Sequence, residues 1–278
     1  MARRRLAIRV AKAAAVAVVL LWSLGPIALI ALAAFTPERE IFAAGHAWSA
    51  WRPTLAHFTG LWLRWHDFFQ GLLNSAIVTA GATVLAVAVS TLAGYGYSRW
   101  RSTFLSGTAF GLIALRLLPP IVTTLPLFPI VNALKLNDTY TVLIVLYAAF
   151  FVSLGTMVMR TFIDQIPRDL DEAAAIDGAT RWQVVRTVIL PLSAQGMVAV
   201  AIFVLVYAWN EFLFAFIFTT KHAKTASLVM AEMIGSLDGV EWGVLFAATL
   251  VQLLPVLAIV VLCQRQLIQG LTAGATKG

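Results

Sequence analysis

Charged side chains are scarce in this chain of 278 residues: Asp, Glu, Lys and Arg make up 12% of the sequence, whereas 60% of the residues are hydrophobic. Soluble domains average roughly 25% charged and 45 to 50% apolar residues. A soluble protein of this length needs far more charge to cover its surface. The mean hydropathy of +0.87 agrees with the composition. The sequence therefore excludes an ordinary soluble protein and indicates a membrane protein.

Residues that bind metals or carry catalysis are also rare. A single cysteine, Cys263, excludes an internal disulfide, a cysteine metal cluster and a thiol redox pair. The four histidines lie outside the apolar segments and beside no acidic cluster, so their spacing does not favour metal binding or catalysis within the membrane: His46, His57, His66 and His222. We therefore expect no metal, no cofactor and no enzymatic activity.

Positive charge exceeds negative charge by seven, because the chain has 20 Lys and Arg against 13 Asp and Glu. In a soluble protein such an excess suggests binding to nucleic acid. Here the basic residues stand in short runs between apolar segments, where they act as topology signals. We predict no nucleic-acid partner.

Six apolar segments have the length that a membrane-spanning helix needs, which is about 20 residues for a hydrocarbon core of roughly 30 Å. They predict an all-α polytopic fold in a single domain over residues 1–278. The first segment is longer than the roughly 7 to 15 apolar residues of a signal peptide, so we interpret it as an uncleaved span. The predicted spans are residues 13–35, 71–98, 104–127, 139–159, 192–218 and 243–262.

The basic residues also predict the orientation of the chain. With the N-terminus inside, the inner segments carry 13 Lys and Arg and the outer segments carry six. This bias favours both termini in the cytoplasm and an even number of spans. Between the first two spans, residues 53–69 are apolar and rich in aromatic residues, which favours a helix that lies along the outer membrane surface.

The inner segment 160–191 has the signals of two short helices. Pro167 and the acidic residues that follow it suit the first turn of one helix, and Gly178 suits its C-terminal cap. Thr180 can then cap a second helix that runs through Trp182 to Pro191. The result is a helix-turn-helix elbow. These signals alone leave open whether the elbow docks another protein or packs against its own bundle.

The elbow carries a known motif. Glu172-Ala173-Ala174, then Gly178, and finally Leu190-Pro191 match the EAA motif, and the segment resembles that of ABC importer permeases. Two positions depart from the pattern: Val188 replaces an isoleucine, and Val185 stands where carbohydrate permeases often have an aromatic residue.

The resemblance extends over nearly the whole chain, including Leu118-Pro119-Pro120, Trp209-Asn210-Glu211-Phe212 and the tail 270–278. These features are similar to the shorter permease subunit of the maltose-type carbohydrate branch. The resemblance implies a subunit of the bacterial or archaeal cytoplasmic membrane that forms the path of a carbohydrate, whether a disaccharide, an oligosaccharide, a polyol or a modified sugar.

The same resemblance implies several partners: a second homologous permease, two ATPase subunits and an extracytoplasmic solute-binding protein, with membrane lipid around them. The chain lacks a G-x4-G-K-[ST] loop, so the partner subunits hydrolyse the ATP. The motif places a cluster of residues at the contact with an ATPase, and the C-terminal tail can reach toward the ATPase pair. The docking cluster comprises Asp171, Glu172, Ala173, Ala174, Asp177, Gly178, Arg181, Leu190 and Pro191.

Polar residues within the predicted spans are candidates for the translocation path. Arg116, and Glu211 with its neighbour Asn210, are costly in lipid and are expected to face protein or a wet cavity. Each could instead have a structural role. Pro119 opens a proline-rich stretch over residues 117–129, which we interpret as a broken segment beside the cavity.

Two other functions remain in view. An ion-coupled secondary carrier normally shows inverted repeats and intramembrane acidic pairs, whereas this chain has only Glu211 and no internal repeat. A structural membrane scaffold would leave the elbow unexplained.

Overall fold

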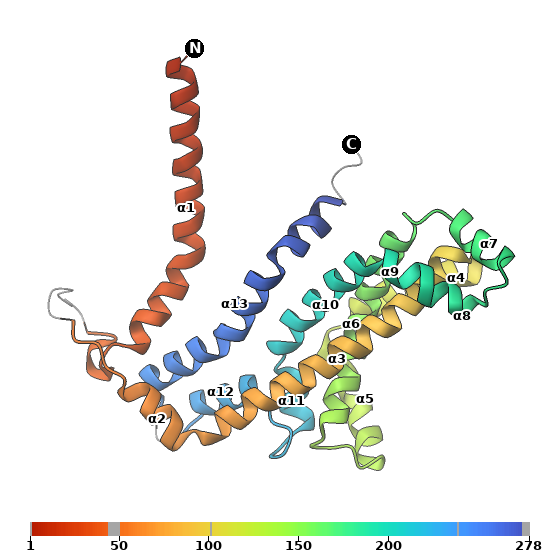
Figure 1. The fold of residues 1–278 in the computed structure, drawn as a ribbon. Coiled ribbons are helices and arrows are strands. Elements are labelled where there is room, and N and C mark those ends of the chain that lie inside the picture. The colour runs from red at the N-terminus through yellow and green to blue at the C-terminus, as the bar shows by residue number, and fades with distance from the viewer. Residues whose placement is uncertain (1, 44–50, 101, 238, 274–278) are drawn as a thin grey trace. The chain divides into compact units, whose positions relative to one another are not determined.

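The computed structural model describes residues 2–43, 51–100, 102–237 and 239–273 (Figure 1). Within these ranges all regular secondary structure is helical. Four helices are long and apolar enough to cross a membrane: Ile8–Ala34, His66–Arg99, Tyr140–Ile163 and Trp242–Gln264. Two bent helix pairs raise the number to six if each pair forms one span. The predicted all-α polytopic fold is confirmed. His46, Arg101 and the end of the tail, 274–278, lie outside the described residues.

One compact unit comprises the chain up to Phe69 together with Val229–Leu254. It contains α1 (Ala2–Ala34), η1 (Glu38–Glu40), α2 (Ala56–Arg64), most of α12 (Ala226–Ile234) and the start of α13 (Trp242–Ala273). The Glu38 carboxylate accepts hydrogen bonds from the backbone N–H groups of Trp242 and Gly243, at 2.9 and 2.8 Å. A carboxylate in this position caps the positive end of α13.

The α2 helix packs beside this cap. Its His57 is buried, with Nε2 2.7 Å from the carbonyl oxygen of Thr36. The ring lies so close to Gly243 that a Cβ there would be 2.2 Å from it, so Gly243 allows the contact. Arg64 forms an ion pair with Glu241. The predicted surface helix over 53–69 is shorter in the structure, because α3 begins at His66.

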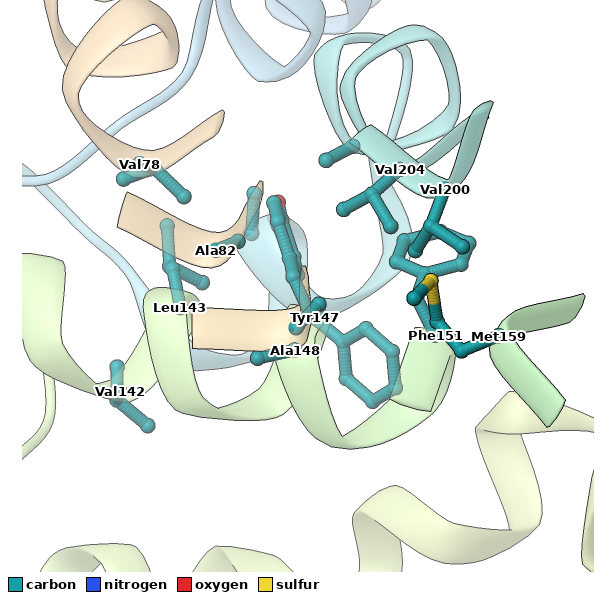
Figure 2. Close-up of a cluster of buried hydrophobic side chains, with 14 of the residues drawn as sticks. Val78, Ala82, Val142, Leu143, Tyr147, Ala148, Phe151, Met159, Val200 and Val204 are labelled. Atoms are coloured by element: carbon teal, nitrogen blue, oxygen red, sulfur yellow. The ribbon is translucent and has the colours of Figure 1, made fainter. Parts of the chain in front are cut away.

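The other unit comprises Gln70–Leu228 and the chain from Pro255 onward. Its core surrounds α6 (Tyr140–Ile163), which lies between α3 (His66–Arg99) and α10 (Ala194–Trp209). Leu143, Tyr147 and Phe151 recur every four residues and therefore share one face of α6. Figure 2 shows these side chains between those of the two neighbouring helices. The other core residues that it labels are Val78, Ala82, Val142, Ala148, Met159, Val200 and Val204.

The third predicted span is bent sharply. α4 (Thr103–Arg116) and α5 (Pro120–Ala133) meet at 99° across residues 117–119. Pro119 has an extended backbone conformation, and Pro120 occupies the first turn of α5, where its missing N–H costs nothing. The predicted broken stretch is therefore shorter than 117–129. Pro126 and Pro129 lie inside α5, since proline has a helical φ and each removes only one backbone hydrogen bond.

The fifth predicted span has one break at its start and a second break within it. The helical segment that ends at Leu192 meets α10 at 75°, and α10 stops at Trp209. Three residues, 210–212, separate it from α11 (Leu213–Phe218). The prediction of one helix over 192–218 is thus replaced by two helices and a turn.

One carboxylate anchors the loop that follows α11. The backbone N–H groups of Thr220, Lys221, His222 and Ala223 all donate to the Asp138 carboxylate, at 2.9 to 3.2 Å. Partial burial alone would raise the pKa of Asp138, but these four donors lower it from 3.8 to about 2. The start of α6 is therefore tied to a loop about 80 residues further along the chain, and the tie holds while Asp138 is ionised.

Candidate functional site

The helix-turn-helix elbow consists of α7 (Asp169–Ile176) and α8 (Arg181–Val184). Asp169, Asp171 and Glu172 occupy the first turn of α7, where negative charge complements the helix dipole. Gly178 ends the first helix with φ +83°. A Cβ at Gly178 would meet no atom within 4 Å, so the backbone conformation, and not the available space, favours glycine here.

The second helix of the elbow starts with a capping box. The Gln183 N–H donates to the Thr180 hydroxyl at 3.4 Å, and the Thr180 N–H donates to Gln183 Oε1 at 2.6 Å. A π-helical segment, η3 (Val185–Ile189), follows and leads into α9 (Leu190–Leu192). The Leu190 N–H donates to the carbonyl oxygen of Val185, five residues earlier, which is the π-helical pattern. The next residue, Pro191, has no backbone N–H to donate.

An ion pair attaches the elbow to the end of α3. Arg99 Nε lies 2.7 Å from Asp171 Oδ2, and the two side chains are 8% and 17% exposed. The same guanidinium donates to the carbonyl oxygens of Ile163 and Ile166, at 3.4 and 3.1 Å. Arg99 therefore joins α3, the end of α6 and α7. Removing one partner of such a buried ion pair strongly destabilises the fold, because the other charge is left buried without compensation.

The residues predicted to dock a partner fall into two groups. Glu172, Ala173, Asp177 and Gly178 are exposed, as are Arg181 and Pro191. Asp171 is engaged within the chain, whereas Ala174 and Leu190 pack partly buried against the core of the unit. Seven of the nine residues thus lie in the elbow, Leu190 and Pro191 lie in α9 beyond it, and only some of the nine are turned outward.

Apolar side chains are also exposed on the elbow. Ile176 is 86% exposed, and Trp182 is 62% exposed. Val185 and Ile189, which the sequence predicts to lie in the same helix as Trp182, are buried. An aromatic residue and an aliphatic residue beside exposed acidic groups provide a surface that a second protein can cover.

The fifth predicted span brings Glu211 into the break between α10 and α11. Its carboxylate accepts hydrogen bonds from the N–H groups of Phe214, at 2.9 Å, and Ala215, at 3.4 Å. Glu211 therefore caps α11, which gives the charge a structural role. Asn210 is exposed and donates to the carbonyl oxygen of Val206 at 2.8 Å. Phe214 is buried and Phe216 is 60% exposed.

Arg116 lies at the end of α4, immediately before the bend that contains Pro119. Its guanidinium carbon is 5.5 Å from the ring centre of Phe150 and 5.7 Å from that of Phe203. These distances are typical of cation–π contacts. Arg116 Nη1 is buried and has no hydrogen-bond partner among the described residues. Because Phe150 also contacts Phe214, with ring centres 6.3 Å apart, Arg116 and the Glu211 cap border one aromatic cluster.

Two residues of functional weight escaped the sequence analysis. Arg99 was counted there only as a topology signal, because nothing in the sequence links it to Asp171, 72 residues later. Trp100 lies under the Arg181 guanidinium, 5.1 Å from it to the ring centre. The basic residue that directly follows a long apolar segment was the only available signal for either contact.

Comparisons with known proteins agree with the motif. Residues 86–272 match the family described as binding-protein-dependent transport system inner membrane component. The trehalose/maltose transport system permease protein MalG of Thermococcus litoralis is 36% identical, over 74% of this chain and 75% of its own. The sulfoquinovosyl glycerol transport system permease protein SmoH of Agrobacterium fabrum is 32% identical, over 95% of this chain and 92% of its own.

A solved structure has the same fold. A chain of a bacterial ABC transporter involved in the import of the acidic polysaccharide alginate superposes with a TM-score of 0.78. The alignment covers 95% of this chain and 97% of the other, at 17% sequence identity.

Proposed function

The chain belongs to the family of binding-protein-dependent transport system inner membrane components, and from this premise we propose that it is the permease subunit of an ATP-binding-cassette importer for a carbohydrate. The observation that carries the proposal is the family match over residues 86–272, together with relatives that are permeases of trehalose, maltose and sulfoquinovosyl glycerol transport. Such a subunit is a multi-pass protein of the inner membrane and a transport component, not an enzyme.

The proposed topology has six spans with both termini in the cytoplasm. Four long apolar helices and two bent pairs support six crossings. The bias of basic residues toward the inner segments supports the orientation. In this topology the elbow projects into the cytoplasm.

The importer needs further subunits. We propose a second homologous permease, two ATPase subunits and an extracytoplasmic solute-binding protein. A solved alginate transporter in complex with its oligosaccharide-bound periplasmic protein has a chain of similar fold, with a TM-score of 0.67, and supports the last of these partners. This chain supplies part of the path and takes its energy from the ATPases.

The elbow is the proposed contact with one ATPase. Its exposed side chains, among them Glu172, Ile176 and Trp182, form the docking surface. Asp171 has a different role, because its carboxylate is held by Arg99 and positions α7 on α3. Movement of the ATPase can thus reach α3 through this ion pair and reach α10 through α8 and α9.

Arg116, Pro119, Asn210 and Glu211 are the proposed elements of the path. They border or interrupt two bent spans around an aromatic cluster. Flat aromatic faces pack against the apolar faces of sugar rings, and the breaks free backbone groups that a wet cavity can satisfy.

The test uses the four-component complex in detergent. ATP hydrolysis should rise when the binding protein carries its sugar, and a screen of disaccharides, polyols and acidic sugars on that protein identifies the substrate. The proposal is contradicted if the rate of ATP hydrolysis does not change when the loaded binding protein is added. It is also contradicted if the complex forms without ATPase subunits. An ion gradient that drives uptake by this chain without ATPases favours the secondary carrier instead.

A further inference from the structure

A polar pocket lies where α3 and α6 end. Its volume is about 430 Å³, and its lining residues come from the end of α3 and from residues 160–168. Three of them are arginines, Arg99, Arg160 and Arg168, and only one, Asp164, is acidic. The pocket is distinct from the exposed surface of the elbow, since the lining stops before α7.

Among the residues that the structure describes, the charges of the pocket leave one cation without a counter-ion. Arg99 is paired with Asp171 at 2.7 Å. Arg160 lies 3.7 Å from Asp164, whose other carboxylate oxygen accepts a hydrogen bond from the Ser98 hydroxyl at 2.6 Å. Within the described part of the chain, Arg168 donates to the backbone carbonyl oxygen of Ser98, at 2.8 Å, and forms no ion pair. With two pairs neutralised, Arg168 gives the pocket a net charge that a single monoanion can balance.

Two of the three arginine side chains of the pocket are accessible, whereas Arg99 is buried. Arg168 is exposed, and the Arg160 side chain is 44% exposed. Each retains N–H donors beyond the contacts just described. Planar N–H forks of this kind match the geometry of phosphate oxygens.

The apolar segments of the sequence give the depth of the pocket. The predicted span 71–98 ends one residue before Arg99, and the predicted span 139–159 ends one residue before Arg160. Both helices continue to these arginines and pack in the same unit. The pocket therefore lies at the level where the hydrocarbon core gives way to phospholipid head groups.

We propose that this pocket binds the phosphate group of an anionic phospholipid of the cytoplasmic leaflet. A phosphodiester carries one negative charge and lies at this depth, and basic pockets between membrane helices on this side bind such head groups. The inference depends on the membrane placement of α3 and α6 and not on which sugar is carried. The lipid would sit beside Arg99 and thus next to the ion pair that holds the elbow.

The experiment measures lipid retention by native mass spectrometry. The importer, purified with its partner subunits, is mixed with phosphatidylglycerol and with a neutral diacyl glycolipid that lacks phosphate. Arg168→Gln should lower phosphatidylglycerol retention about fivefold, the factor expected for one basic group at a membrane surface. Arg160→Gln in addition should lower it further, because the second change removes another guanidinium and leaves the Asp164 carboxylate without its counter-ion. Arg168→Lys should retain an intermediate amount, since it keeps the charge and loses the fork.

Arg9→Gln is the matched control, because Arg9 is an exposed arginine of a segment that the sequence predicts to be cytoplasmic, and it does not line this pocket. It should leave retention unchanged, and none of the variants should change retention of the glycolipid. Equal retention of phosphatidylglycerol in all variants overturns the proposal. So does the loss of ATPase subunits at unchanged lipid retention, which would assign the pocket to a protein contact. Displacement of the lipid by millimolar inorganic phosphate would keep the phosphate site and assign it to the free anion.

Discussion

At the scale of single residues, Gly178 is the position where conformation alone decides the outcome. It has φ +83° with open space around its Cα. Gly178→Val should strain the turn by about 1 to 2 kcal/mol, because a β-branched residue is disfavoured at positive φ. We expect uptake to collapse while the chain still inserts into the membrane. Gly178→Asn should retain more uptake, since asparagine tolerates this conformation.

Gly111 provides the control for that substitution. Its Cα also faces open space, and it lies inside α4 without a positive φ. Gly111→Val should leave the coupling of ATP hydrolysis to uptake intact. If the Gly178→Val protein binds the ATPases and transports at the wild-type level, the elbow does not transmit the movement of the ATPases to the permease.

Asp138 makes a pH-dependent contribution to stability. Its folded-state pKa of about 2 lies below the ordinary 3.8, so the ionised carboxylate contributes stability above about pH 4 that is lost as the pH falls toward 2. Asp138→Asn should lower the free energy of unfolding by about 1 kcal/mol near neutral pH, after allowance for solvent screening. Thermal unfolding of the purified chain at several pH values measures the difference, which should shrink in acid. A difference that stays constant down to pH 2 would refute the role of the carboxylate.

At the scale of helices, the attachment of α7 to α3 depends on one ion pair. Asp171→Asn leaves Arg99 buried without its counter-ion and should cost about 3 kcal/mol, at the lower end of the values for broken buried pairs. We expect the variant complex to hydrolyse ATP without the stimulation that the loaded binding protein gives the wild type.

A charge exchange between Arg99 and Asp171 distinguishes two roles of Asp171: holding α7 on α3, or contacting the ATPase. If Asp171 only holds α7, Arg99→Asp with Asp171→Arg should recover part of the stimulation, because the attraction is restored in reverse. If Asp171 instead contacts the ATPase, the exchange should be worse than Asp171→Asn. Glu172→Lys serves as the comparison, since Glu172 is exposed and its reversal should impair docking without a rescuing partner.

The break between α10 and α11 depends on Glu211. Glu211→Gln keeps an oxygen that can accept from the Phe214 N–H, whereas Glu211→Leu leaves that donor without its partner. We predict near-normal protein levels and uptake for the glutamine variant and a loss of both for the leucine variant. A functional Glu211→Leu protein, together with a cysteine at this position that never reacts with an external thiol reagent, would place the path elsewhere.

At the scale of the whole molecule, the sequence predicted what hydrophobicity and local motifs determine. Long apolar runs specified α1, α3, α6 and α13, and the turn signals at Gly178 and Thr180 specified the elbow. Hydrophobicity is a sum over a segment, so it does not reveal where a segment bends. The 99° turn at Leu117–Pro119 and the gap at residues 210–212 depend on tertiary packing and on a carboxylate cap.

The long-range polar contacts could not be predicted from the sequence either. Arg99 forms an ion pair with Asp171, and the Asp138 carboxylate accepts hydrogen bonds from N–H groups of residues 220–223. No local sequence pattern encodes contacts across such separations. These contacts join helix ends and loops that lie far apart in the sequence. The ion pair between Arg99 and Asp171 is also the contact on which the account of the elbow rests.

The most direct test of ATP-driven carbohydrate import is sugar uptake into proteoliposomes that contain the whole complex. We predict accumulation of the sugar that the binding protein carries, only when ATP is present on the side of the elbow, and equally well after ionophores have removed all ion gradients. Uptake that needs no ATP and stops with the ionophores would contradict the account.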